Sequence, residues 1–233
     1  MTQRPEPPGD PIQEFFREAL LIGGEATRLY LVRHAQSQGN TGEDLTTGDA
    51  DLTDVGREQA RRLGARFAKQ KIAAVYASPF RRTQETAAYI ADAAGLEVRS
   101  KGDLREVALG QADYDIRLLP RDEQAKVAKR IVAEGTWDAF PGSEGSAAAR
   151  ARVQAVINEI VRDHAGKRIV AVAHAGFMQT FVSAMLGLQR DYIFYPFNAS
   201  ITSVRAKGGR FVLWRLNDIA HLEGMEVGFG GIS

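Results

Sequence analysis

The chain has 233 residues, of which 44% are hydrophobic and 25% charged, so it can bury a substantial core in one α/β domain. Its 30 Lys and Arg nearly balance its 29 Asp and Glu, and a net charge of +1 argues against a general attraction to nucleic acid or to an anionic membrane. The absence of cysteine excludes disulfides, thiolate nucleophiles and cysteine-ligated zinc. Chemistry must therefore rest on His, Arg, Glu, Asp, Ser and Thr, and any recognition of anions must be local.

The first 26 residues are expected to form an N-terminal arm with a short helix around "FFREALLI". Four of the eight prolines lie within residues 1–14, and the opening "MTQRPEPPGDPIQEFF" lacks the basic-then-apolar order of a secretory signal. No apolar run approaches the roughly 20 residues that span a bilayer. We expect a soluble, cytoplasmic protein in which residues 27–233 form a single domain.

Strand-like and helix-like segments alternate in the first half of that domain. "RLYLVRH" (28–34) and "KIAAVYAS" (71–78) read as buried strands, and Thr53 is a plausible N-cap of the helix between them. In "SPFRRTQETAAYIADAAG", Ser78 is expected to cap a second helix that ends at Gly95, with Pro79 at its first position. The residues expected on its core face are Phe80, Thr83, Ala87, Ile90 and Ala94.

The second half repeats the pattern. A helix is expected from about Ser146, and "KRIVAVAHAGF" again shows a strand, a histidine, small residues and a helix. "SITSVRA" and "RFVLWRL" read as a hairpin across Gly208 and Gly209. Together these elements predict an α/β fold: a three-layer αβα sandwich whose sheet is mostly parallel with an antiparallel edge.

Polar residues follow the predicted strands. Arg33 and His34 end the first strand, Arg82 follows the second, and His174 follows the third. In open parallel sheets the loops at the carboxyl ends of the strands converge, so these side chains should share one edge. A neutral imidazole can attack phosphorus, and guanidinium groups can neutralise phosphoryl oxygens. Glu106, in "DLREVALG", would supply the proton that a leaving alkoxide needs.

Each of these residues also has a purely structural interpretation. Arg33 can cap a strand, and Glu106 can be an exposed acid paired with a nearby base. Arg82 has Arg81 beside it, and one of these two arginines can be a solvated charge on the helix surface. His164 is expected near a helix C-terminus, where an imidazole meets the helix dipole favourably, and His221 is expected to be a packed structural residue.

Several blocks together resemble the histidine phosphatase superfamily, which includes cofactor-dependent phosphoglycerate mutases and many broad phosphatases. "LVRHAQSQGN" is similar to its signature at Arg33, His34, Ser37 and Asn40, with Ala35 in place of the usual glycine. Further matches follow in the family's order, so the resemblance covers roughly residues 29–222 and is more specific than one Arg-His pair. These matches are "LTDVGREQA", "SPFRRTQETA", "LREVALG", "FPGSEGS" and "VAVAHAGF".

The resemblance implies a phosphoglycerate mutase-like fold and a residue-by-residue mechanism. His34 would attack the phosphorus of a monoester and form a phosphohistidine, and Glu106 would act as general acid and then as general base. Arg33, Arg82 and His174 would hold the phosphoryl oxygens, with Asn40 as a further donor and Ser37 beside it. No metal or other cofactor is called for, because arginine and imidazole supply the positive charge. Ala35 is harmless if its φ is negative and strained if its φ is positive.

The segment 107–140 separates phosphatase from mutase. Mutases of the family carry a long insertion after the acidic residue that keeps water away, whereas only 34 residues lie here between Glu106 and Pro141. The segment has an amphipathic centre and is expected to form a cap helix over the site, so hydrolysis is preferred over phosphoryl transfer to a sugar phosphate or phosphoglycerate. Its basic residues could meet an acidic substrate or form the solvated face of that helix. They are Arg117, Arg121, Lys126 and Lys129.

Two other classes of function were compared. A non-catalytic module that binds phosphorylated ligands would keep Arg33 and Arg82 but could dispense with His34 and Glu106, and both are present. A nucleic-acid-binding protein should show a basic patch interleaved with aromatic residues, which this chain lacks. The expected partner is a small phosphomonoester or phosphate, without nucleic acid or membrane. The oligomeric state is left open, a homodimer included.

Overall fold

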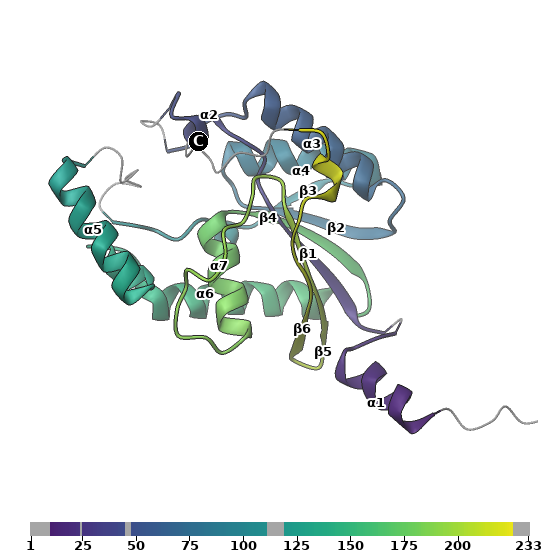
Figure 1. Cartoon of the computed structure of the whole chain (residues 1–233). Helices are drawn as coiled ribbons and strands as arrows, with labels where there is room; N and C mark the ends of the chain where they lie inside the picture. Colours follow the sequence, from purple (N-terminus) through teal and green to yellow (C-terminus); the bar gives the residue numbers. More distant parts are fainter. Residues whose placement is uncertain (1–9, 24, 45–47, 111–118, 226–233) are drawn as a thin grey trace, which may run out of the picture.

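A six-stranded sheet with the strand order β3-β2-β4-β1-β5-β6 forms the centre of the molecule (Figure 1). The computed structural model describes residues 10–23, 25–44, 48–110 and 119–225. The strands are β1 (Thr27–Arg33), β2 (Ile72–Ala77), β3 (Val98–Ser100), β4 (Arg168–Ala173), β5 (Ile201–Lys207) and β6 (Arg210–Asp218). The first four of these are parallel to one another, while β5 and β6 form the predicted hairpin and pair antiparallel. The predicted mostly parallel sheet with an antiparallel edge is therefore confirmed.

Helices α3 (Asp54–Phe67) and α4 (Arg81–Ala94) cover one face of the sheet (Figure 1). They bury the apolar positions that recur at helical spacing against every second residue of β1, β2 and β4. The central side chains of this layer are Val32, Ala60, Leu63, Phe67, Val75, Ala87, Ile90, Val170 and Val172. Thr53 caps α3 as expected, because its hydroxyl accepts a hydrogen bond from the Gly56 N–H.

The start of α4 differs from the prediction. Its N-cap is Phe80 rather than Ser78, and the helix begins at Arg81. The Ser78 N–H still bonds to the β4 backbone, and the side chains of Thr83 and Gln84 both donate to the Ser78 carbonyl. These bonds hold residues 78–80 as a turn and leave the Ser78 hydroxyl for another partner. The predicted end at Gly95 is confirmed, with a left-handed φ of +66° that suits glycine.

Helices α6 (Gly145–Asp163) and α7 (Ala175–Met185) cover the opposite face. Their core positions pack against the alternate residues of the same strands. The central side chains of this layer are Leu29, Leu31, Val153, Val156, Ile157, Ile160, Ile169, Ala171, Phe177, Phe181 and Val182. Because both faces of β1 and β4 are buried, these strands lie in the middle of the three layers.

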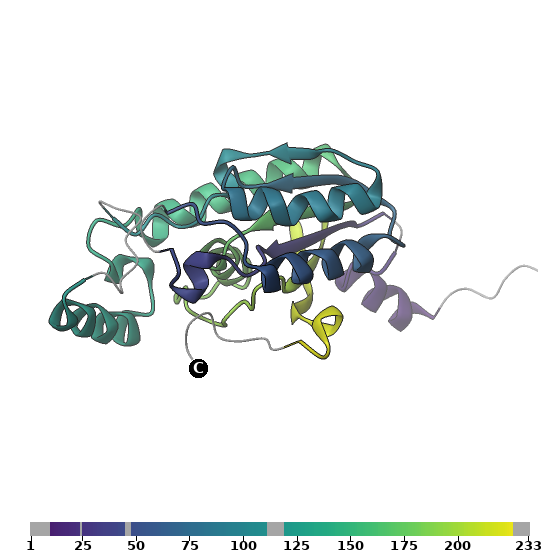
Figure 2. The same cartoon turned by 90° about the horizontal axis from the view of Figure 1, so that it is seen from above.

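The expected N-terminal helix forms but is not packed into the core. It is α1 (Pro11–Ala19), capped by the Asp10 side chain, and none of its residues is buried. Phe15 is 66% exposed. Figures 1 and 2 show α1 at the opposite end of the molecule from α5 (Arg121–Glu134).

The helix expected in segment 107–140 is α5. Val127 is its one buried residue among those the structure describes, and α5 packs against the short helix η3 (Trp137–Ala139). Lys126 pairs with exposed acids on α5 itself, as expected of a solvated face. Arg117 lies outside the described residues.

Among the described residues, three further short helices connect the elements: α2 (Gln38–Thr41), η1 (Gly102–Leu104) and η4 (Ala220–Leu222). Over the described part of the chain, no helix combines the length and apolar character needed to cross a bilayer.

Candidate active site

Three neighbouring strands deliver the predicted polar residues to one edge of the sheet. Arg33 at the end of β1 pairs in register with Ala173 at the end of β4. The His34 N–H donates to the Ala173 carbonyl (3.0 Å), so the parallel ladder continues one residue past β1. The rings of His34 and His174 consequently lie side by side and meet edge to face, with their centroids 5.4 Å apart and their planes at 61°.

The His34 ring is buried and held in one tautomer. Its Nδ1 lies 2.8 Å from the Ala35 carbonyl oxygen, and because a carbonyl only accepts, Nδ1 must carry the hydrogen. The lone pair is then on Nε2. Burial, followed by the charges of Arg82 and Arg33, holds the pKa of His34 well below its ordinary value of 6.5. At neutral pH His34 is therefore a neutral imidazole whose lone pair is on Nε2.

His174 is held in the opposite tautomer. Its Nδ1 lies 3.2 Å from Nη2 of Arg82, which can only donate, so Nδ1 accepts. The hydrogen on Nε2 is then donated to the Ser78 hydroxyl, 2.9 Å away. Burial, followed by the charges of Arg82 and of the His34 ring, also lowers the pKa of His174 well below 6.5. The side chain of Ser78 thus positions His174 instead of capping α4.

Two arginines flank the histidines. Arg33 is 6% exposed, and its Nη1 donates to the Pro196 carbonyl at 2.6 Å. The Nε atom of Arg33 is buried without a hydrogen-bond partner among the described residues. Leaving such a donor unsatisfied is costly, so an anionic oxygen is a fitting partner.

Arg82 reaches the same edge from α4. Its Nη1 donates to the Gly48 carbonyl (3.1 Å), and its guanidinium lies 4.6 Å from the centre of the Phe80 ring. The Phe80 ring is also 5.3 Å from that of His174. The prediction that Phe80 faces the core was therefore wrong: this N-cap side chain is partly exposed and packs against the two polar groups of the site.

The loop after β1 is fixed by residues that the sequence left without a role. The Ala35 N–H donates to the Thr86 hydroxyl (3.0 Å), and the Gln36 N–H donates to Gln59 Oε1 (2.9 Å). Gly56 packs so closely that a Cβ atom there would lie 1.9 Å from the Gln36 carbonyl oxygen. The block "LTDVGREQA" therefore supports the loop that carries His34.

Ala35 is accommodated without strain. It is fully buried, and it is not among the non-glycine residues with positive φ in the described chain, which are Leu21, Ala199 and Asn217. An alanine fits this backbone as well as the family's glycine does.

Asn40 and Ser37 lie next to each other in the same loop. Oδ1 of Asn40 accepts hydrogen bonds from the Ser37 N–H (3.0 Å), the Ser37 hydroxyl (3.2 Å) and Nδ2 of Asn198 (3.0 Å). These three donors fix which way the Asn40 amide points. The hydroxyl of Ser37 is buried and used in orienting Asn40.

Glu106 lies at the N-terminus of α7, next to His174. One carboxylate oxygen, Oε1, accepts the N–H groups of Val107 and Phe177 (both 2.9 Å), and Oε2 accepts that of Gly176 (3.1 Å). A Cβ atom on residue 176 would lie 2.6 Å from Oε1, so this approach needs glycine. Since Oε2 accepts only one of these three bonds, it has more capacity left for a further hydrogen bond.

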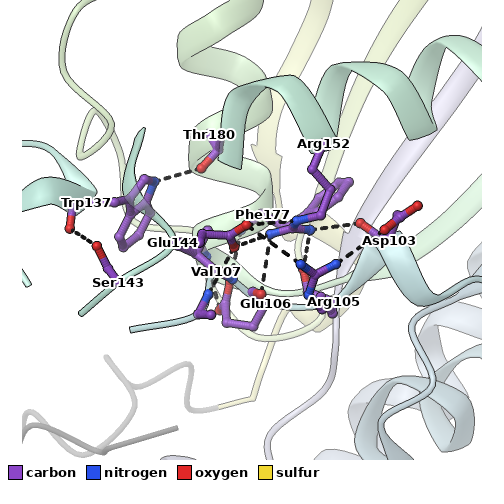
Figure 3. A network of polar contacts seen from close by, with 12 residues as sticks. Asp103, Arg105, Glu106, Val107, Trp137, Ser143, Glu144, Arg152, Phe177 and Thr180 are labelled. Atoms are coloured by element: carbon purple, nitrogen blue, oxygen red, sulfur yellow. Dashed lines mark hydrogen bonds and ion pairs between the residues drawn. The ribbon is translucent and has the colours of Figure 1, made fainter. Parts of the chain in front are cut away.

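A partly buried ion pair supports the segment that carries Glu106 (Figure 3). Arg152 on α6 binds both carboxylate oxygens of Glu144, at 2.5 and 3.1 Å, and also donates to the carbonyls of Asp103 and Arg105. Glu144 accepts the N–H of Ala108 (3.0 Å). Burial opposes ionisation of Glu144, but Arg152, this N–H and Arg105 together hold its pKa below its ordinary value. The sequence block "FPGSEGS" contains Glu144 but gave no sign of this role.

The remaining two histidines lie elsewhere. His164 follows α6, and its Nε2 forms a hydrogen bond with the Tyr76 hydroxyl (2.9 Å), in keeping with a structural role. His221 lies in η4, beside the buried Leu222. Within the part of the chain that the structure describes, no three His, Asp or Glu side chains are grouped so as to hold a metal ion.

The arrangement agrees with the match of residues 29–219 to the model of the histidine phosphatase superfamily, branch 1. The chain belongs to this family. It is 30% identical to phosphoserine phosphatase 1 of Hydrogenobacter thermophilus, over 84% of this chain and 94% of that protein. It is also 32% identical to phosphoglycerate mutase-like protein 4 of Arabidopsis thaliana, over 87% of this chain and 91% of that protein.

Solved structures agree with the fold. A complex of mycobacterial glucosyl-3-phosphoglycerate phosphatase with inorganic phosphate has a TM-score of 0.69 and 26% identity, covering 83% of this chain and 98% of that one. The predicted family and fold are therefore confirmed. The predicted enzyme class, phosphoric monoester hydrolase, is that of the phosphatases among these relatives.

Proposed function

We propose that the protein hydrolyses small phosphomonoesters without a metal ion, through a phosphohistidine on His34. The observation that carries this proposal is a buried neutral imidazole whose Nε2 lone pair is left for reaction, with Arg33 and Arg82 beside it. A lone pair on a nitrogen next to two cations suits attack on a phosphoryl group, whose oxygens the cations neutralise.

In the first step, Nε2 of His34 attacks phosphorus as the bond from phosphorus to the leaving oxygen breaks. Glu106 gives its proton to that oxygen, so the product leaves as a neutral alcohol. The guanidinium groups of Arg33 and Arg82 take up the charge on the phosphoryl oxygens, and the unpartnered Nε of Arg33 supplies a donor for one of them.

In the second step, Glu106 accepts a proton from water, whose oxygen attacks the phosphorus. The phosphorus–nitrogen bond breaks, inorganic phosphate forms and His34 returns to its neutral state. Throughout, the bond from Nδ1–H to the Ala35 carbonyl keeps the ring in the orientation and tautomer that the attack requires.

His174 and Asn40 complete the proposed phosphate site. In the free protein Nδ1 of His174 accepts from Arg82. For His174 to donate to a phosphoryl oxygen through Nδ1, the Ser78 hydroxyl would have to reverse and donate to Nε2, which a hydroxyl can do. Asn40 would donate through its Nδ2 group.

The proposal is tested with a panel of phosphomonoesters in EDTA, including phosphoserine, 3-phosphoglycerate and an aryl phosphate. We expect turnover in EDTA and a loss on the order of 10⁴-fold or more in His34→Ala. An acid-labile phosphoprotein should accumulate in wild type during rapid quench and be absent in His34→Ala. His164→Gln is the matched control, because it alters a buried histidine outside the site.

Full activity in His34→Ala, or a strict requirement for Mg²⁺, would overturn the mechanism. Transfer of the phosphoryl group to a second phosphoglycerate instead of water is the alternative, and ³¹P NMR of the products separates the two. Ligand binding with no turnover of any ester would favour a non-catalytic module.

A further inference from the structure

A second asparagine, Asn198, lies behind the proposed phosphate site and contacts two of its residues. It belongs to the turn 195–200, which precedes β5 and which the sequence patterns left without a role. Asn198 is 4% exposed. Its Nδ2 group donates to the His34 carbonyl (3.1 Å) and to Oδ1 of Asn40 (3.0 Å).

The hydrogen-bond directions around Asn198 follow one from another. The backbone N–H of Ser37 can only donate, so Asn40 must present Oδ1 to it. Asn198 faces the same oxygen and the His34 carbonyl, which are both acceptors. Only the NH₂ end of Asn198 satisfies both, and its two hydrogens match the two acceptors. The amide of Asn40 is consequently held with Nδ2 directed away from Ser37 and Asn198.

The backbone of the turn adds to this contact. Ala199 has a left-handed φ of +58°, a conformation that costs a non-glycine residue about 1 kcal/mol or more. In it the Ala199 N–H also donates to the His34 carbonyl (3.2 Å). Further along, the Ser200 carbonyl accepts the Arg33 N–H (3.1 Å), and the Pro196 carbonyl accepts from the Arg33 guanidinium. The turn therefore contacts Arg33, His34 and Asn40 together.

We infer that Asn198 is a positioning residue for phosphate binding: held by the His34 carbonyl, it fixes Oδ1 of Asn40 and so turns Nδ2 of Asn40 toward the phosphate. The inference rests on the proposed function for the role of Asn40 and His34. A purely structural role would weaken phosphate binding whether or not Asn40 is present. The positioning role instead requires that the effect of Asn198 on phosphate binding depend on the Asn40 side chain.

A double-mutant cycle tests this dependence. Asn198→Ala should weaken the binding of inorganic phosphate, measured calorimetrically, about 5- to 20-fold, and should lower kcat/KM about 10- to 100-fold. In the Asn40→Ala background, the same substitution should weaken phosphate binding less than about twofold further, because the group that Asn198 orients is already gone. Asn158→Ala, on the exposed side of α6, is the control and should change neither quantity.

The conservative variants separate positioning from folding. Asn198→Asp places an acceptor against two acceptors and should lose more kcat/KM than Asn198→Ala, whereas Asn198→Ser, which keeps one small donor, should lose less. If Asn198→Ala does not fold, the Ser and Asp variants replace it in the cycle, and circular dichroism melting identifies that case.

Equal losses of phosphate affinity in the wild-type and Asn40→Ala backgrounds would overturn the positioning role. An inactive wild-type protein would instead overturn the proposed function. The phosphate titration distinguishes these two failures, because it reads the effect of Asn198 without requiring turnover.

Discussion

His34 and His174 lie at the ends of two adjacent buried strands, whereas Glu106 lies on the segment 103–108, which has no regular structure beyond the end of η1. The strand-end group (Arg33, His34, Arg82 and His174) is held by the sheet and by bonds to backbone carbonyls and to the Ser78 hydroxyl, and the Asp49 carboxylate lies 3.7 Å from the Arg82 guanidinium. Segment 103–108 is held by α7 backbone N–H groups and by the ion pair between Glu144 and Arg152.

This difference suits the two roles that the proposed mechanism requires: His34 must stay unprotonated in order to attack phosphorus, whereas Glu106 must give and accept a proton. Burial and neighbouring cations lower the pKa values of both histidines, so His34, the proposed nucleophile, is neutral. Glu106, the proposed general acid and base, is instead oriented at a helix terminus by backbone donors. Substitutions in the two regions should therefore fail in different ways.

After His34→Ala, the largest effect is expected from Glu106→Gln, which keeps the shape of the side chain but removes the proton. Activity should drop on the order of 10²–10⁴-fold on alkyl phosphates and clearly less on aryl phosphates, because a good leaving group needs little protonation. Steady-state kinetics on a leaving-group series measures this. Equal losses across the series would count against Glu106 as the general acid.

A somewhat smaller effect is expected from Arg82→Met in the strand-end group. The loss of kcat/KM should be about 10²–10³-fold, and its pH profile should also move. In wild type, His34 is neutral well below pH 6.5, so activity should persist as the pH falls through that value. Without the Arg82 charge the pKa of His34 rises, and the acidic limb should shift to higher pH. If the acidic limb of the pH profile does not shift, protonation of His34 does not determine that limb.

An intermediate effect is expected from Arg152→Met, which removes the support of segment 103–108. The side chains of Arg152 and Glu144 are 9% and 13% exposed, so Glu144 would be left with little solvent and one partner fewer. We expect a loss of about 2–4 kcal/mol in the free energy of unfolding. A drop of about 10- to 100-fold in kcat should accompany it, with little change in the phosphate affinity of the strand-end group. Urea unfolding measures the free energy of unfolding, steady-state kinetics measures kcat, and a phosphate titration measures the phosphate affinity. A weaker phosphate affinity with unchanged kcat would reverse the assignment.

The smallest effect is expected from Ala35→Gly, which restores the family's usual residue. Because the φ of Ala35 is not positive, glycine relieves no strain and adds backbone freedom to the unfolded chain. Stability should fall by about 1 kcal/mol while kcat/KM stays within about twofold. Thermal unfolding and an aryl phosphate assay are sufficient. A stabilised variant would mean that the loop is strained after all.

The strand-end group was predictable from the sequence because its signals are local. Apolar runs such as "LYLV" indicate buried strands, and the polar residues that follow must gather where parallel strands end. The family blocks added Asn40 and Ser37, and they placed the acidic residue of the family on Glu106, which the residues had already suggested as a proton donor. The residues that hold this group in place were not predictable, because their contacts join distant parts of the chain. The contacts of Ser78 with His174 and of Asn198 with His34 span 96 and 164 residues.

Ser78 and Phe80 show how local signals can mislead. A serine before a proline is typical of a helix start, and the sequence favoured capping. In the fold, the hydroxyl gains a buried imidazole as its partner, and the helix starts at Arg81 instead. The apolar ring of Phe80 likewise suggested a core position, but the nearby guanidinium and imidazole provide a surface on which it packs.

The register between β1 and β4 sets the dimensions of the site. Adjacent strands lie about 4.8 Å apart, and the ring centroids of His34 and His174 are separated by 5.4 Å, close to that spacing. The sheet therefore fixes the distance between the side chains of His34 and His174. A slip of one residue in β1 would turn the side chain of His34 to the other face of the sheet. Changes in substrate range should therefore come from segments outside the sheet, because their length and shape can vary without altering the spacing between His34 and His174.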